Sequence, residues 1–333
     1  MNDISVQSDY WRSRSNYAKN NNVYTVICDQ STADGEQCID DSQWRVWISG
    51  QNGKHTINND TRSGTADYSA DSYRTVAGLD YAINKNTLLG FAFGSSKTQF
   101  DVAERDTSGL VESNSLAFYG SKDFDKMYLK GALSYDWLDA ETRRFAFVEG
   151  STAPIIPVAG VANNLQAQFD GKTFNGRLEA GYKTNWKKLN ITPFAGVQLS
   201  FAKIGAATET AAESDDALAL AYSKNDAYSA PVFVGAQIDS MFMLSEGSIQ
   251  PYAKLSFAHD FSTKRAMEAS FVSAPGYKFE VQGAVPDANT MDVNLGFKMT
   301  SITNLAFYGQ FNGQYSENGA KNEGGTLGLE VHW

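Results

Sequence analysis

The sequence predicts an all-β protein, a 12-stranded antiparallel transmembrane β-barrel. From Trp44 onward, apolar and polar residues alternate with a period of two, which is the pattern of a strand with one greasy and one wet face. Short turns and long polar connections follow one another along the chain. No window approaches the roughly 18 consecutive apolar residues that a membrane helix needs, so helical spans are excluded. The length of 333 residues fits a single all-β domain.

The clearest alternation lies in residues 290–301. Met291, Leu295 and Met299 occupy one face of this segment, whereas Asp292 and Lys298 occupy the other. The same pattern recurs in residues 174–183, 249–257 and 304–315. A soluble sandwich also alternates in this way, so the alternation alone does not place the protein in a membrane.

The connections between the strands favour a membrane barrel. Short turns on one side and long loops on the other are typical of outer-membrane barrels, so we expect a Gram-negative outer-membrane location with lipid as a partner. With an even number of strands, the start of the first strand and the end of the last strand lie on the same side of the membrane. The strands are expected to begin near Trp44, Ser72, Asn86, Val111, Lys126, Asp170, Lys188, Tyr222, Ser248, Thr290, Asn304 and Gly324. Tight turns are expected at 84–85, 123–125, 187–188, 245–247 and 301–303, and long polar loops at 51–71, 101–110, 141–169, 205–221 and 260–288.

Two sets of side chains follow from this arrangement. Aromatic residues near strand ends fit the interfacial girdles of a membrane barrel, although each is equally compatible with an ordinary core position. Charged residues on the wet faces are expected to line the pore, because charge of both signs is tolerated only in a wet or plugged lumen. The girdle candidates are Tyr81, Phe124, Trp137, Trp186 and Trp333. The expected pore-lining residues are Arg74, Asp80, Lys130, Asp136, Arg177, Glu179, Lys183, Lys254, Asp292 and Lys298.

The chain divides into an N-terminal segment, residues 1–43, and the barrel, residues 44–333. Cys28 and Cys38 flank a short polar stretch, and in an oxidising compartment this pair predicts a disulfide. Two free thiols, or metal ligands without a His or a second Cys pair nearby, are the alternatives. Residues 1–10 lack the charged-then-apolar plan of a signal peptide, so we expect a processed or truncated chain.

Composition and motifs argue against several function classes. The formal net charge is −10 and no basic patch is interleaved with aromatics, so we expect no nucleic-acid partner. No phosphate-binding loop or metal-ligand spacing is found, and we predict no cofactor, metal or catalytic residue. Glu213, Asp215 and Asp216 are interpreted as a solvated charge run.

The histidines provide the main case for an enzyme. His55, His259 and His332 are the only candidate imidazole bases. Ser256, Asp260 and Ser262 lie near His259, but they form no recognisable nucleophile motif. Structural or rim positions for these histidines are the preferred interpretation.

The last ten residues carry a family resemblance. Gly324 to Trp333 alternate and end in an aromatic residue. This strand resembles the β-signal by which the barrel assembly machinery recognises outer-membrane proteins, with Gly328, Leu329, Val331 and Trp333 at the signal positions. The usual last residue of that signal is Phe, whereas this chain ends in Trp.

Three further stretches, residues 251–261, 269–281 and 189–201, resemble the autotransporter β-domain family, and the resemblance extends over residues 44–333. It implies a monomeric translocator of the type Va secretion pathway that anchors an N-terminal passenger and exports it. It further implies two sets of assembly partners, the barrel assembly machinery and periplasmic chaperones.

The resemblance also implies that residues 1–43 plug the pore, and we expect them to be part helix and part extended. Arg12, Arg14 and Lys19 would then meet acidic lumen residues, or else remain solvated.

Alternatives stay open at this point. Some members of the family cleave their passenger between two asparagines, and Asn20-Asn21-Asn22 invites that hypothesis, although a polar turn explains the run equally well. Two other functions are alternatives to the translocator. The chain is then a barrel without a passenger that acts as a structural partner or narrow pore, or it is a barrel-based hydrolase.

Overall fold

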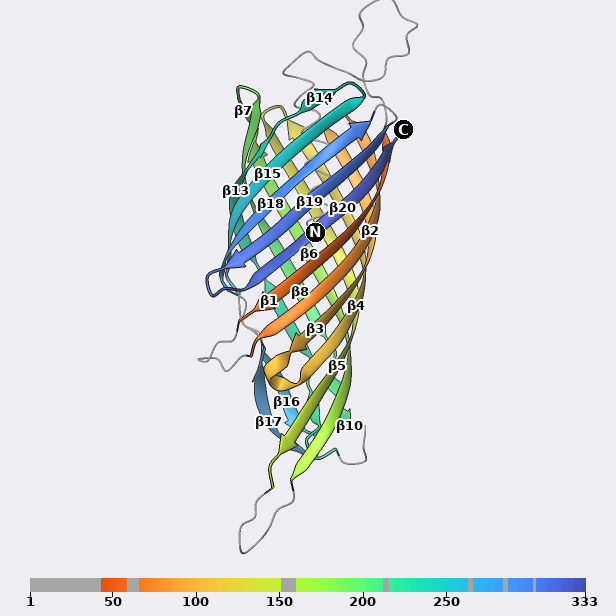
Figure 1. Cartoon of the computed structure of the whole chain (residues 1–333). Coiled ribbons are helices and arrows are strands. Elements are labelled where there is room, and N and C mark those ends of the chain that lie inside the picture. Colours follow the sequence, from red (N-terminus) through yellow and green to blue (C-terminus); the bar gives the residue numbers. More distant parts are fainter. Residues whose placement is uncertain are drawn as a thin grey trace, which may run out of the picture.

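A computed structural model describes residues 43–58, 66–150, 160–211, 216–262, 266–283, 287–301 and 304–333. In these residues, long antiparallel strands form one sheet that closes on itself as a barrel (Figure 1). The barrel strands are β1 (Trp44–Ile57), β2 (Tyr68–Asn84), β3 (Thr87–Val102), β4 (Thr107–Phe124), β5 (Met127–Val148), β6 (Val161–Tyr182), β8 (Leu189–Ile204), β12 (Asn225–Ser229) with β13 (Pro231–Asp239), β15 (Gly247–Asp260), β18 (Asn289–Ser301), β19 (Leu305–Ser316) and β20 (Lys321–His332).

Two pairings close the ring. β1 pairs with β20, and β6 pairs with β8, so that every barrel strand has a neighbour on both sides. β12 and β13 pair with successive parts of β8 and together make one strand of the barrel. The prediction of a 12-stranded antiparallel barrel is confirmed. Closure gives hydrogen-bond partners to the backbone N–H and C=O groups of the first and last strands, which a sheet requires in order to be stable in lipid.

One end of the barrel, here called the turn end, carries the short connections and the C-terminus (Figure 1). Only Lys85 and Asn86 separate β2 from β3, and only Asp125 and Lys126 separate β4 from β5. The short strands β7 (Thr184–Trp186) and β14 (Phe242–Leu244) extend two further hairpins at this end. Asp125 and Lys187 have φ of 60° and 57°, the left-handed conformation that tight hairpin turns require.

At the opposite end, here called the loop end, the strands run further than their apolar alternation. β5 and β6 have 22 residues each and project past the other strands (Figure 1). The expected loop 101–110 is reduced to the short helical turn Ala103–Arg105, because β3 continues to Val102 and β4 begins at Thr107. Backbone pairing continues into water, where a lipid-facing apolar pattern is no longer needed to stabilise the strands.

The two faces of the sheet differ in chemistry. On β1, Val46 and Ile48 project outward and are 43% and 50% exposed, whereas Arg45 and Trp47 point inward and are buried. Outward positions on the other barrel strands are likewise rich in exposed Leu, Val and Phe. Within the described ranges, no helix is long and apolar enough to span a membrane.

Glycines opposite large aromatic rings allow the inner face to pack. A Cβ atom built on Gly90 of β3 would lie 2.3 Å from the Tyr119 ring, and one on Gly181 of β6 would lie 2.3 Å from the Tyr128 ring. Both tyrosines are almost fully buried. The rings lie flat over the neighbouring strand only because these positions have no side chain.

This packing makes a prediction for Gly90→Ala. The new methyl group would collide with Tyr119 and with the Asp80 carboxylate, so we expect the free energy of unfolding to fall by about 1 to 3 kcal/mol. Urea titration of the refolded barrel in detergent measures this loss. Gly50→Ala is the matched control, because a Cβ atom at Gly50 meets nothing within 4 Å. Equal stability of the two variants would contradict the prediction.

Candidate functional site

The inner wall of the barrel is polar and charged. Along β6, Arg177 and Glu179 belong to the inward set, while Leu178 and Ala180 face outward. Among the ten residues expected to line the pore, Asp80, Lys130, Glu179, Lys183, Lys254 and Lys298 are buried. Arg74, Asp136, Arg177 and Asp292 are partly buried.

Glu179 lies at the centre of one group of these side chains, the Glu179 cluster, which comprises Tyr128, Lys130, Arg177, Glu179 and Lys254. The carboxylate is fully buried, and it lies 2.9 Å from Lys130 Nζ and 3.2 Å from Lys254 Nζ. Tyr128 donates a hydrogen bond of 2.8 Å to it, and Arg177 contributes a longer ion pair of 3.5 Å. The cluster thereby joins β5 and β6 to β15, which is not their neighbour in the sheet.

Aromatic rings cover the cations of this cluster. The Arg177 guanidinium lies 4.0 Å from the centre of the Phe233 ring, and Lys254 Nζ lies 4.3 Å from the centre of the Phe194 ring. Such cation–π contacts strengthen where water is excluded. Sequence reasoning missed both phenylalanines, although each shares its strand face with polar inward positions.

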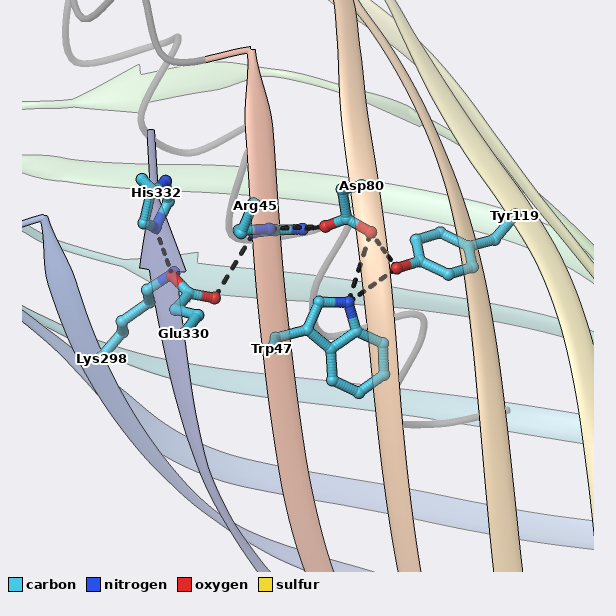
Figure 2. Close-up of polar contacts among 7 residues, drawn as sticks. All are labelled: Arg45, Trp47, Asp80, Tyr119, Lys298, Glu330 and His332. Atoms are coloured by element: carbon cyan, nitrogen blue, oxygen red, sulfur yellow. Dashed lines mark hydrogen bonds and ion pairs between the residues drawn. The ribbon is translucent and has the colours of Figure 1, made fainter.

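A second group, the seam cluster, comprises Arg45, Trp47, Asp80, Tyr119, Lys298, Glu330 and His332 (Figure 2). Asp80 accepts hydrogen bonds from Arg45 Nε at 2.5 Å, from Trp47 Nε1 at 3.3 Å and from the Tyr119 hydroxyl. Glu330 forms ion pairs with Arg45 and Lys298. Of this cluster, only Asp80 and Lys298 were among the expected pore-lining residues, and His332 was expected to face the lumen. The inward parity of β1, β4 and β20 is the signal that identifies the others.

Smaller polar contacts occupy other inward positions. Lys183 Nζ lies 2.8 Å from Asp123, and Asp239 accepts hydrogen bonds from Asn190 at 2.9 Å and Gln250 at 3.0 Å. Buried carboxylates on this wall thus have cationic or amide partners, as their desolvation requires.

A cavity of about 550 Å³ lies in the lumen, lined by inward residues from most of the barrel strands. Arg74, Asp136 and Asp292 contribute its charges, and the rest of the wall consists largely of amide and hydroxyl groups. Asp136 accepts a 2.7 Å hydrogen bond from Asn175, and Asp292 accepts one of 2.9 Å from Gln314. The cavity therefore offers a polar surface with few fixed charges.

At the loop end, two connections fold into a separate four-stranded sheet, the outer sheet, in the order β17-β16-β11-β9. Its strands are β9 (Ala207–Thr208), β11 (Leu220–Tyr222), β16 (Ala266–Phe271) and β17 (Ala274–Gln282). The neighbouring short strand β10 (Thr210–Ala211) pairs with β6. Tyr222 packs on Phe169, and Phe169 has the inward parity of β6. The outer sheet therefore lies against the wall that continues the lumen (Figure 1).

Glu209 fixes the outer sheet to the barrel. Its carboxylate is 3% exposed and accepts two hydrogen bonds from the Arg144 guanidinium of β5, at 3.0 and 2.6 Å. It also accepts hydrogen bonds from the Leu220 amide at 2.8 Å and the Tyr222 hydroxyl at 3.0 Å. Burial, and then the negative charge of Glu209, raise the pKa of Tyr222, so this hydroxyl stays a donor at neutral pH.

The closing strand β20 presents an apolar outer face. Leu329, Val331 and Trp333 are exposed there, and Gly328 lies against the Tyr308 ring on the inner side. Trp333 and Trp44 exchange two backbone hydrogen bonds of 3.1 Å, which brings the first and last residues of the barrel together at the turn end.

Several predicted residues lie outside the described ranges. These are Arg12, Arg14, Lys19, Asn20-Asn21-Asn22, Cys28, Cys38, Glu213 and Asp215. Asp216 is described, and it accepts a hydrogen bond from the Ala211 amide rather than standing alone in solvent. Among the described residues, no group of three or more His, Cys, Asp or Glu side chains has the geometry to hold a metal ion.

The attachment of the outer sheet gives a testable expectation for Arg144→Met. The buried Glu209 carboxylate would lose its cation, so the outer sheet should lose about 2 to 4 kcal/mol of local stability. Hydrogen exchange of residues 216–222 measures this change. Arg143→Met is the control, because Arg143 is exposed and its pair with Glu141 is worth about 1 kcal/mol at most. Unchanged exchange in the Arg144 variant would refute this role.

Comparisons with known proteins agree with the fold. The family model for the autotransporter beta-domain matches residues 46–312. The extracellular serine protease of Serratia marcescens is 20% identical over 271 residues, which cover 79% of this chain and 24% of that protein. The chain thus spans about a quarter of the length of this relative.

Two solved structures share the architecture. The translocator domain of the autotransporter NalP from Neisseria meningitidis has a TM-score of 0.65 at 14% identity, with 99% of each chain covered. The beta domain of the Bordetella autotransporter BrkA has a TM-score of 0.58 at 13% identity, covering 87% of this chain and all of that one. The resemblance predicted from the sequence is confirmed. The chain belongs to the autotransporter β-domain family and is a translocator barrel of the Gram-negative outer membrane.

Proposed function

We propose that this translocator carries a passenger, attached N-terminal to the barrel, through its lumen to the cell surface and then holds it there. The position of β1 supports this proposal more than any other observation. Trp44 starts β1 at the turn end, where it pairs with Tyr81 and hydrogen-bonds to Trp333. A passenger that precedes β1 reaches the loop end by running once through the barrel.

The size of the lumen limits what passes. A 12-stranded barrel leaves an interior about 10 Å wide, which admits one helix or one extended hairpin. A folded domain does not fit, so the passenger crosses unfolded. The cavity wall of amides and hydroxyls suits this task, because it forms exchangeable hydrogen bonds with any peptide backbone rather than selecting one sequence.

Residues 1–43 are proposed to lie in the lumen as the plug once transport ends. A span of about 30 Å needs only about 20 helical residues, so this segment is long enough to cross. Asp136 and Asp292 line the cavity and are the acidic groups that Arg12, Arg14 and Lys19 would approach there.

The barrel itself is proposed to act without catalysis. His259 Nδ1 contacts the Asn289 amide at 2.8 Å, His332 contacts Glu330 at 3.1 Å and His55 lies against the Tyr68 ring. These contacts give the three imidazoles an amide, a carboxylate and an aromatic ring as partners, whereas activation of a serine requires its hydroxyl within hydrogen-bonding reach of the imidazole. Any activity of the exported protein would therefore belong to the passenger.

Removal of residues 1–43 tests the plug. We expect single-channel conductance in planar bilayers to rise several-fold on deletion, because the lumen would lose its occupant. The full chain is the reference, and an Arg12→Gln, Arg14→Gln, Lys19→Gln variant shows whether charge holds the plug. Conductance that is the same with and without the segment would eliminate the plug, and would favour a passive narrow pore.

The closing strand is proposed to bind the barrel assembly machinery through Gly328, Leu329, Val331 and Trp333. Trp333→Ala should then abolish most membrane insertion, read as loss of the heat-modifiable, protease-resistant form. Trp186→Ala is the control, since Trp186 is a comparably exposed aromatic at the same end of the barrel. Normal assembly of the Trp333 variant would refute the proposal that Trp333 is part of an assembly signal.

A further inference from the structure

The seam, which is the pairing of β1 with β20, differs from every other pairing in the barrel. It joins the first and last strands of the barrel, from Arg45↔His332 to Thr56↔Lys321. Neighbouring strands elsewhere are consecutive along the barrel sequence, so a turn or loop limits their register. No connection sets the register of β1 against β20. Side chains and backbone complementarity must do so.

The middle of the seam gives little side-chain information. Gly53 faces Gly324, Asn52 faces Gly325 and Ser49 faces Gly328. Glycine-rich strands specify their register weakly and are prone to slip. The neutral hydrogen bond of 3.0 Å from Gln51 to Thr326 is a modest constraint.

Charged side chains cross the seam near the turn end (Figure 2). Arg45 lies between Asp80 of β2 and Glu330 of β20, with Nη1 at 3.5 Å from the Glu330 carboxylate. The side chains of Arg45 and Glu330 are 1% and 0% exposed. Lys298 of β18 and His332 also contact Glu330, so the contacts continue from β18 across the seam to β2.

Most small register errors separate these charges. A slip of one residue turns every side chain of β20 to the opposite face and places Glu330 in lipid. A slip of two residues keeps the faces and moves Glu330 about 7 Å along the strand. In one direction Glu330 comes to lie opposite Ser49, away from Arg45, whereas in the other direction it lies opposite Arg45 and the ion pair is kept. The one-residue slips and the two-residue slip toward Ser49 each remove one partner from a buried ion pair, which is far more costly than losing a neutral contact.

We propose that Arg45 and Glu330 form a register key for barrel closure: their ion pair disfavours the alignments of β1 with β20 that separate these two buried charges. The key acts when the ends of the chain meet, after the consecutive hairpins have formed, because contacts over a long sequence separation close last. The inference concerns assembly, so it stands or falls independently of passenger export.

Cysteine cross-linking across the seam tests the key. Ile48→Cys with Leu329→Cys reports the native register, and Ile48→Cys with Val331→Cys reports the two-residue slip that sets Glu330 opposite Ser49, in a chain whose Cys28 and Cys38 are replaced by Ser. Membranes are treated with a lipid-soluble oxidant, and the ratio of slipped to native cross-link is measured. We expect Arg45→Met and Glu330→Gln to raise this ratio by about tenfold or more, and Arg45→Lys to keep it near the parent value.

Glu179→Gln is the matched control. Glu179 is as deeply buried as Glu330 and pairs with two lysines, but its partners lie on β5 and β15, away from the seam. If the single variants assemble too poorly, the ratio of slipped to native cross-link is measured in the double variant Arg45→Met/Glu330→Gln. This variant removes both charges, so neither is left buried without the other. A ratio equal to that of the parent, or equal to that of Glu179→Gln, overturns the proposal.

Discussion

Closure of the sheet is the constraint on which the rest of this structure depends. In lipid, an unpaired edge would leave backbone N–H and C=O groups without partners at several kcal/mol each, so the first and last strands must meet. The antiparallel order with an even number of strands brings Trp44 and Trp333 to the same end and lets them share two hydrogen bonds. Both faces of the barrel then follow: alternate residues meet lipid or lumen, and the chain supplies apolar groups for one and polar groups for the other.

The polar lumen creates its own problem, which the two side-chain clusters solve. Buried charge is tolerated only with a partner, and here some of the partners come from strands that are not neighbours in the sheet. Glu179 of β6 pairs with Lys254 of β15, and Asp80 of β2 binds Tyr119 of β4. Such contacts cross the barrel interior instead of following one strand pair. They therefore stabilise its curvature as well as its individual hairpins.

The sequence predicted the repetitive parts of the fold. Period-two alternation identified the barrel strands, and short polar turns such as the one predicted at 84–85, found at Lys85-Asn86, gave their order and direction. The outer sheet was not foreseen, because strands of two or three residues such as β9 and β11 leave no periodic pattern. Strand ends at the loop end were placed too early, since pairing there continues without the lipid-facing alternation on which the prediction relied. Individual inward charges were identifiable by parity, whereas their partners depend on the strand tilt and stagger that set contacts across a barrel.

The two ends of the barrel are stabilised in different ways, and the difference fits transport in one direction. At the turn end, short hairpins and the seam cluster join the strands directly, so this end is fixed by the same contacts that close the barrel. At the loop end, the outer sheet is built from connections and is attached to the barrel wall through Glu209, Arg144 and one short pairing with β6. Rearranging the outer sheet breaks no barrel pairing, whereas widening the turn end would break the seam. A chain that enters at the turn end thus meets a rigid frame first, and the part of the structure that can adjust to it lies where it leaves.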